Sequence, residues 1–333
     1  MSAVASTPPM ARATRLRALG WALLLAFLAS VPFWAGAFYL EFATLILIFA
    51  LFAMSLGMLV GVAGMVSLGH AAFFGIGAYT TALLIERGIL RVAWVLPASA
   101  LAAALAALVI GALAVRTSGV SFIMITLALA QLVYSVALNA PWAGSTDGML
   151  LAQRPVLGIP GIDLEQPAQF YGYCLLLGVA SYGVMRRLTA SAYGHALRGI
   201  RLNPERMEAL GYRIAAFRLA AFVQAGLFAG IAGHCYAAAQ FFIDPTSLHW
   251  TASGQVLMMV VLGGEGTLLG PALGALIFHG LEQWISAYTE HWMLPMGIVL
   301  VLLVLFGRGG TARLGMDLRA VRDRTAAGTR EAP

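Results

Sequence analysis

LEFATLILIFALFAMSLGMLV (residues 40–60) carries a single charged side chain, that of Glu41. A helix needs about 20 mostly apolar residues to cross the hydrocarbon core of a bilayer, and this stretch meets that requirement. The composition of the whole chain agrees, because 61% of its 333 residues are hydrophobic and only 10% are charged. A soluble domain carries about a quarter charged residues, so most of this chain is expected to face lipid.

Similar apolar stretches occur along the rest of the chain and give ten candidate spans in all. They are residues 18–38, 40–60, 64–86, 93–115, 119–139, 168–188, 218–240, 251–266, 270–288 and 293–307. The third, eighth and tenth are short or crowded with glycine, so eight to ten spans fit the pattern. The predicted fold class is therefore all-α, a polytopic transmembrane helical bundle of about ten spans.

The first span follows a basic segment, as the apolar core of a secretory signal peptide does. Arg12, Arg15 and Arg17 precede the apolar run 19–31. This run continues directly into further apolar residues, with no soluble domain to export behind it. We therefore interpret it as a retained membrane span.

The distribution of basic residues predicts the orientation, because arginine beside short loops stays on the cytoplasmic side. All 20 basic residues are arginine, and a ten-span bundle with a cytoplasmic N-terminus leaves only Arg87, Arg91 and Arg154 outside. Both termini are therefore predicted to be cytoplasmic. The expected parts are a cytoplasmic segment 1–17, a transmembrane domain 18–307 with an outer loop 140–167 and a cytoplasmic loop 189–217, and a cytoplasmic tail 308–333.

Several functional classes lack the residues that they need. Without lysine, the chain has no P-loop lysine for nucleotide phosphates and no amine for a Schiff base. Cys174 and Cys235 lie in apolar stretches without His or Cys at metal-ligand spacing, so both are expected to be small buried hydrophobes. The arginines punctuate apolar runs and form no basic stripe on a soluble domain, which argues against nucleic acid. We expect no enzyme activity, cofactor or metal.

The polar segment SAYGHALRGIRLNPERMEALGYR (191–213) predicts two short helices joined by a turn. Ala196, Leu197 and Ile200 share one helical face, and Arg198 and Arg201 point elsewhere, as in an amphipathic helix.

Its second half carries the signals of a separately capped helix. Asn203 is a good N-cap, Pro204 suits the first helical position, and Glu205 favours the positive end of the helix dipole. Gly211 fits a C-terminal cap. Such a capped pair of helices either docks a cytosolic partner or lies on anionic lipid headgroups.

The glycine-rich stretch GMVSLGHAAFFGIGAYTTALL (64–84) is expected to be a membrane helix whose small residues, Gly64 and Gly69 among them, allow close packing. Its histidine lies at membrane depth, where a polar side chain marks either a functional site or a hydrogen bond between helices. The candidate residues for a translocation path are Ser67, His70, Thr126 and Gln131. In VVLGGEGTLLGPALGALIF (260–278), the glycines favour a tight inner turn over a broken helix that lines a cavity.

The chain resembles the branched-chain amino acid permeases of ATP-binding-cassette importers, the LivH/LivM type, and is more similar to the LivM branch. The resemblance extends in collinear order over about residues 57–307. Its most specific segments are GMLVGVAGMVSLGHAAFFGIGAYTTALL (57–84), SGVSFIMITLALAQLVYSVALN (118–139), GSTDGM (144–149), GIPGI (158–162), YGHALRGIRLNPERMEALGYRIAAFRLAAFVQAGLFAGIAG (193–233) and FFIDPTSLHWTASGQVLMMVVLGGEGTLLGPALGA (241–275).

The resemblance implies a function and a set of partners. A permease of this type moves branched-chain amino acids across the bacterial inner membrane by alternating access and has no nucleotide site of its own. It pairs with a second related permease, two cytoplasmic ATP-binding subunits and a periplasmic substrate-binding protein.

The resemblance also implies site residues. The family's ATPase-coupling segment falls on Gly194, Arg198, Asn203, Pro204, Glu205, Ala209, Leu210 and Gly211. The outer segment with Gly144, Ser145, Asp147 and Gly148 would lie on the binding-protein side.

Two positions depart from the family pattern and leave the substrate open. Gln255 stands where related sequences often carry an acid, and Glu265 stands where they usually carry a small or apolar residue. Importers of this shape are also linked to urea, short amides and aromatic acids.

Two other classes are less compatible with the sequence. An ion-coupled secondary transporter would be expected to carry ionisable residues in the middle of its spans, whereas this chain keeps its acids near span ends. An intramembrane enzyme would require a nucleophile and a base on facing helices. Ser67 and His70 are the only such pair, and we expect them on one helix.

Overall fold

The computed structural model describes residues 9–289, 291 and 293–306, and within them the chain is almost entirely helical. The tail 308–333 and the first eight residues of the segment 1–17 lie outside the described residues. The long helices are α1 (Pro9–Trp34), α2 (Ala37–Met58), α3 (His70–Glu86), α4 (Val92–Ala114), α5 (Val120–Asn139), α6 (Pro167–Ala190), α9 (Ile214–Gln240), α10 (Trp250–Gly263), α11 (Gly270–Ser286) and α12 (Met293–Phe306).

Shorter elements lie between these helices. They are a π-helical turn, η1 (Leu59–Ala63), that continues α2; the helices α7 (Ala192–Leu202) and α8 (Pro204–Ala209); the 3-10 turns η2 (Pro141–Ala143), η3 (Ser145–Asp147) and η4 (Pro245–Leu248); and the strands β1 (Met149–Leu150) and β2 (Phe242–Ile243). The two strands pair antiparallel, with Met149 opposite Ile243. The predicted all-α class is confirmed for the described residues.

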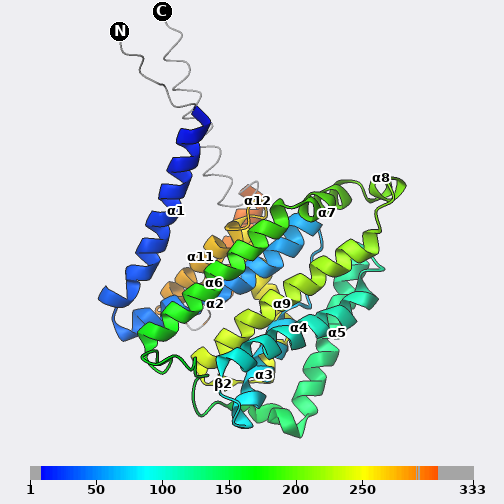
Figure 1. The fold of residues 1–333 in the computed structure, drawn as a ribbon. Coiled ribbons are helices and arrows are strands. Elements are labelled where there is room, and N and C mark those ends of the chain that lie inside the picture. The colour runs from blue at the N-terminus through cyan, green and yellow to red at the C-terminus, as the bar shows by residue number, and fades with distance from the viewer. Residues whose placement is uncertain (1–8, 290, 292, 307–333) are drawn as a thin grey trace, which may run out of the picture.

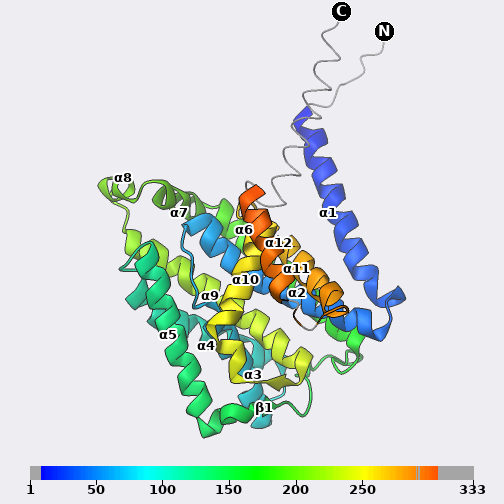
Figure 2. The same ribbon diagram turned by 180° about the vertical axis from the view of Figure 1, so that it is seen from behind.

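The bundle is built around α9, which packs against α3, α4 and α2 (Figure 1). The hairpin of α10 and α11 covers another side of α2, and α6 packs beside it. Helix α1 lies at the edge, where Tyr171 Oη donates a hydrogen bond to the Leu28 carbonyl at 2.8 Å. Helices α7 and α8 lie at one end of the bundle, called here the α7 end. Strands β1 and β2 lie at the opposite end, called the β end (Figure 2).

Small residues bring the central helices into close contact, as the sequence predicts. A Cβ atom at Gly77 of α3 would clash with the backbone of Gly230 in α9, and one at Gly233 would clash with the Phe74 carbonyl. Such close approach favours helix association in lipid, where no hydrophobic force drives it. The glycines of α3 and α9 therefore act in packing.

Four helices are long and apolar enough to cross a membrane: Ala37–Ala63, Val92–Ala114, Val120–Asn139 and Ile214–Gln240. Two shorter apolar helices, Leu23–Trp34 and Trp250–Gly263, accompany them. The described residues therefore contain several helices that are able to span a membrane. The count of ten spans and the cytoplasmic placement of both termini stay predictions.

The helix predicted over 64–86 begins only at His70, so the prediction was wrong for its first six residues. Gly64 has a φ of +69°, a left-handed conformation that ends the preceding helix, and residues 64–69 form a non-helical connection. The segment is mainly apolar, and hydropathy does not distinguish a buried connection from a helix. Gly64 and Gly69 therefore do not lie on the membrane helix, and Ser67 and His70 do not share one helix.

The turn predicted near residue 265 is confirmed. Helix α10 ends at Gly263, Gly264 adopts a φ of +89°, and α11 begins at Gly270. At 1.5 Å per residue, α10 is only about 21 Å long. It is therefore shorter than the hydrocarbon core of a bilayer, about 30 Å.

Candidate functional site

The α7–α8 segment is the candidate coupling site, and α7 has the predicted amphipathic form. Gly194, Ala196, Leu197 and Ile200 are buried, whereas His195 and Arg201 are exposed and Arg198 is half-buried. A Cβ atom at Gly194 would clash with the Thr189 carbonyl at the end of α6. Only glycine therefore allows the chain to fold back so tightly after α6.

Tyr193 anchors the buried side of α7 to α9. Its ring stacks on Phe217 with a centroid separation of 5.6 Å, and its hydroxyl donates to the Phe217 carbonyl at 3.4 Å. Burial raises the pKa of Tyr193 to about 12, because desolvation disfavours the phenolate. The hydroxyl is therefore a neutral donor at physiological pH.

Helix α8 is capped at both ends by the residues that the sequence indicates. The Asn203 side chain accepts a hydrogen bond from the Arg206 amide at 2.9 Å, and Pro204 occupies the first turn. At the other end, Gly211 has a φ of +87°. Its amide donates to the Glu208 carbonyl at 2.8 Å and the Tyr212 amide to the Met207 carbonyl at 3.1 Å. This pair of bonds is the Schellman motif.

The surface of α8 is open although the segment is well ordered by its caps. None of its residues is buried, and Leu202 and Leu210 are 86% and 67% exposed at its two ends. Glu205 and Ala209 are exposed as well, and α8 projects from the α7 end in Figure 1. Leu202 at the end of α7 and Leu210 after α8 thus leave apolar side chains exposed on both sides of this projecting helix.

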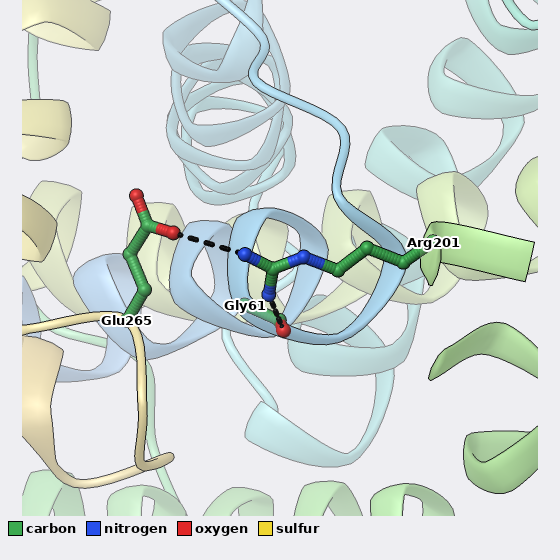
Figure 3. A network of polar contacts seen from close by, with 3 residues as sticks. All are labelled: Gly61, Arg201 and Glu265. Carbon is green, nitrogen blue, oxygen red and sulfur yellow. Dashed lines mark hydrogen bonds and ion pairs between the residues drawn. The ribbon is translucent and has the colours of Figure 1, made fainter. Parts of the chain in front are cut away.

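Arg201 connects α7 to two other elements of the α7 end (Figure 3). Its Nη1 donates to the Gly61 carbonyl in η1, and its Nη2 lies 3.4 Å from Glu265 Oε2 in the turn between α10 and α11. The carbonyls of a last helical turn lack partners within the helix and favour a positive charge. Arg201 therefore joins α7 to the helical turn that follows α2 and to the turn between α10 and α11.

Sequence reasoning did not identify this connection. Arg201 was expected only to point away from the apolar face, and Glu265 was singled out only as a departure from the family pattern. The sequence signal for this pair was an acidic side chain at a predicted inner turn, on the side of the membrane where mainly arginine was expected. Both side chains are about 40% exposed, so the pair contributes at most about 1 kcal/mol to stability.

The candidate residues of the translocation path lie where α3 and α10 begin inside the bundle. The Ala71 amide, in the first turn of α3, donates to Ser253 Oγ in the first turn of α10 at 2.8 Å. His70 Nε2 lies 2.8 Å from Ser55 Oγ of α2. Ala63 is the last residue of η1, and Ser55 lies about 12 Å before it along the helix axis, at 1.5 Å per residue. This junction therefore lies well below the α7 end.

The structure brings three of the four candidates together. Ser67, His70 and Thr126 are all fully buried, and a Cβ atom at Gly69 would lie 2.5 Å from the Thr126 carbonyl. Ser67 Oγ accepts from the Gly69 amide at 3.2 Å, and Thr126 Oγ1 donates to the Ile123 carbonyl at 2.9 Å. Non-helical backbone at membrane depth is tolerated only where protein surrounds it. The junction is therefore buried inside the bundle.

Gln131, the fourth candidate, lies farther along α5. Its Nε2 is 3.4 Å from His249 Nε2, just before α10 begins. His249, which precedes α10, thus contacts α5, and Gly69, which precedes α3, contacts α5 as well.

The outer segment 144–148 forms tight turns at the β end. Gly144 and Gly148 adopt φ values of +75° and +73°, and Ser145 adopts +49°. Asp147 is exposed, while Met149 behind it is buried and pairs with Ile243. The segment is therefore fixed to β2 and presents its polar residues at the end of the molecule opposite α7 (Figure 2).

The described residues contain no group of three or more His, Cys, Asp or Glu that is able to hold a metal ion. Cys174 and Cys235 are buried and form no disulfide.

Comparisons with known proteins identify relatives over most of the chain. The family described as "Branched-chain amino acid transport system / permease component" matches residues 38–306. The protein "High-affinity branched-chain amino acid transport system permease protein LivM" of Escherichia coli K12 is 29% identical over 307 residues, which cover 85% of this chain and 72% of that protein. The LivM protein of Salmonella typhimurium is 28% identical over 305 residues, with the same coverage. No solved structure matches.

Proposed function

Because this chain belongs to the family of permease components of branched-chain amino acid transport systems, we propose that ATP hydrolysis on separate subunits drives it through the α7–α8 segment. A permease component of this family is a multi-pass membrane protein and carries no catalytic nucleotide site. The energy for transport must therefore enter from outside the chain. The α7 end is then cytoplasmic and the β end faces outward.

The observation that carries this proposal is the contrast between the two sides of the segment. Its buried side packs against α6, α9 and η1, and Arg201 connects it to Gly61 and Glu265. Its open side presents α8 with exposed Glu205 and Leu210. A partner bound on the open side thus moves α2 and the α10–α11 hairpin through contacts that already exist.

We assign the substrate to branched-chain amino acids, after the relatives that share most of the chain. Glu265, one of the two departures from the family pattern, contacts Arg201 at the α7 end. It is thus engaged in coupling and gives no reason to choose another solute. Gln255 in α10 is the remaining departure. Urea, short amides and aromatic acids are the alternatives that an uptake assay separates.

The proposed assembly contains a second related permease, two ATP-binding subunits and a periplasmic binding protein. We propose that the outer segment 144–148, in which Thr146 and Asp147 are exposed, meets the binding protein, since it lies opposite the ATPase side. The buried α3–α10 junction is the proposed gate, because both of its helices begin there and are held by single hydrogen bonds. Alternating access then consists of opening this junction when α7 moves.

The test uses the whole transporter in vesicles, with radiolabelled leucine as substrate. Leu210→Ser and Glu205→Ala should lower ATP-driven uptake at least tenfold and release the ATPase subunits during purification. Ile89→Ser is the matched control, because Ile89 is 40% exposed in the turn before α4 at the β end. Unchanged uptake by the Leu210 variant would show that the segment does not dock the ATPase.

A further inference from the structure

A cavity of about 240 Å³ opens at the β end, between the ends of α2, α6, α9 and α11. Two oppositely charged residues, Glu41 and Arg154, line it together with the rings of Phe38 and Phe42 and the side chains of Gln240 and Gln283. The volume is slightly below the ~300–1,000 Å³ of pockets for drug-sized ligands. It therefore suits a small solute.

Arg154 is held rigidly in the cavity wall. It is only 7% exposed, and its guanidinium lies between the rings of Phe170 and Phe241, at 4.2 and 4.7 Å from their centroids. Its Nε donates to the Ala238 carbonyl at 3.0 Å, and its Nη1 donates to the carbonyls of residues 164 and 165 at 3.0 and 3.2 Å. The carboxylate of Glu165 lies close to it, since its Oε1 accepts from the Arg154 amide at 2.7 Å, and supplies part of the counter-charge that a buried cation needs.

The guanidinium is not fully satisfied by the protein. It carries five N–H donors, and among the residues that the structure describes no group accepts from Nη2. Burial lowers the pKa of Arg154, and the carboxylate of Glu165 and, less strongly, that of Glu41 oppose this change. Arginine nevertheless stays charged, so two N–H donors of a buried cation remain available beside the cavity.

Glu41 supplies the opposite charge at the same cavity. It is exposed on the first turns of α2 and forms no hydrogen bond or ion pair with any other described residue. The two charges thus face one cavity without pairing with each other. This arrangement suits a ligand that carries both a carboxylate and an ammonium group.

We propose that this cavity binds a zwitterionic α-amino acid at the outward end of the permease. The carboxylate accepts from Arg154 Nη2, the ammonium donates to Glu41, and the apolar side chain lies against Phe38 and Phe42. Planar donors of arginine suit carboxylates, and a site with few polar groups in an apolar wall fixes orientation. The inference rests on the proposed function, and it adds a substrate site on the permease itself.

The experiment measures ligand binding to the whole transporter in phosphatidylcholine nanodiscs, without the binding protein, by saturation-transfer NMR. The probes are leucine, 4-methylpentanoate, which lacks the ammonium, and 3-methylbutylamine, which lacks the carboxylate. Leucine should bind at least tenfold more tightly than either analogue. Glu41→Gln should weaken leucine and 3-methylbutylamine about tenfold and leave 4-methylpentanoate unchanged, a selectivity that a purely structural role would not produce.

Two further variants complete the design. Arg154→Lys should weaken leucine and 4-methylpentanoate and spare 3-methylbutylamine. Because Arg154 also supports the outer loop, the Glu41 variant decides the outcome if the Arg154 variant misfolds. Glu86→Gln, an exposed acid at the end of α3, is the matched control and should bind all three probes as the wild type does.

Equal leucine binding by wild type and Glu41→Gln would overturn the inference. Phosphatidylglycerol discs distinguish an amino acid from an anionic lipid headgroup. If the wild type loses leucine binding in these discs while leucine binding by Arg154→Lys is the same in both lipids, the ligand of the cavity is the headgroup. This result would also overturn the inference. Neither result touches the proposed function, because ATP-driven uptake and the Leu210 variant test that separately.

Discussion

The α7–α8 segment and the α3–α10 junction both depend on capped helix ends, yet their caps come from different places. In α8 the cap of the first turn is Asn203, which is adjacent in sequence and exposed. In α3 the second amide, that of Ala71, is capped by Ser253 from a distant helix, and all of these groups are buried. The first arrangement is local and open to a partner, whereas the second exists only when the bundle is assembled.

This difference determines what each region is able to do. An end that is capped locally keeps its shape when a partner binds or leaves, which suits a docking surface. An end that is capped by another helix loses its partner when the helices separate, and burying an unsatisfied amide costs about 1–3 kcal/mol. For the gate proposed above, a cost of this size favours the arrangement in which the two helices are in contact.

The largest expected effect comes from adding volume to the junction. Gly69→Val should destabilise the chain by more than about 3 kcal/mol, because a Cβ atom at this position would press on the Thr126 carbonyl 2.5 Å away. Unfolding in mixed dodecyl sulfate and dodecylmaltoside micelles measures the free energy. Gly254→Ala, where nothing lies within 4 Å of the added atom, is the control.

The matched substitution in the docking segment should cost much less. Gly211→Val meets no atom within 4 Å but must adopt a φ of +87°, which costs about 1–2 kcal/mol. Equal losses at Gly69 and Gly211 would contradict the contrast between a packed junction and an open segment.

The next largest losses of stability are expected when the two caps are removed. Ser253→Ala leaves the Ala71 amide buried without a partner and should cost about 1–3 kcal/mol. Asn203→Ala exposes an amide that water is able to satisfy, so its loss should be about 0.5–2 kcal/mol.

The functional outcomes of the two cap variants should also differ. Ser253→Ala removes a bond of the closed state and should raise basal leakage of leucine from vesicles, whereas Asn203→Ala should not. Equal leakage from the two variants would show that the α3–α10 junction is not the gate.

The comparison also shows how far the sequence predicts this molecule. Asn203 and Gly211 act through bonds to residues three positions away, and Pro204 acts through its fixed backbone angle, so local rules predicted α8 and both of its caps. The connection 64–69 is mainly apolar and lies among apolar neighbours, and its close contact with Thr126 of α5 is a tertiary one. Periodicity carries no information about such a contact.

The site residues divide in the same way. The buried face of α7 was predicted from spacing, because one helical period places Ala196, Leu197 and Ile200 together. The Arg201–Glu265 pair joins positions far apart in sequence, and the cavity charges of Glu41 and Arg154 come from two different segments. No local pattern brings these residues together, so they became visible only in the fold.

The smallest expected effect on stability concerns the link between the two regions. Arg201 and Glu265 are each about 40% exposed and 3.4 Å apart, so a double-mutant cycle with Arg201→Ala and Glu265→Ala should give a coupling energy below about 1 kcal/mol. Transport should respond far more strongly, because this contact joins the docked helix to the α10–α11 hairpin. ATP hydrolysis should continue in both variants while leucine uptake falls severalfold. A large stability coupling with unchanged uptake per ATP would make the pair a structural contact and would remove it from the coupling route.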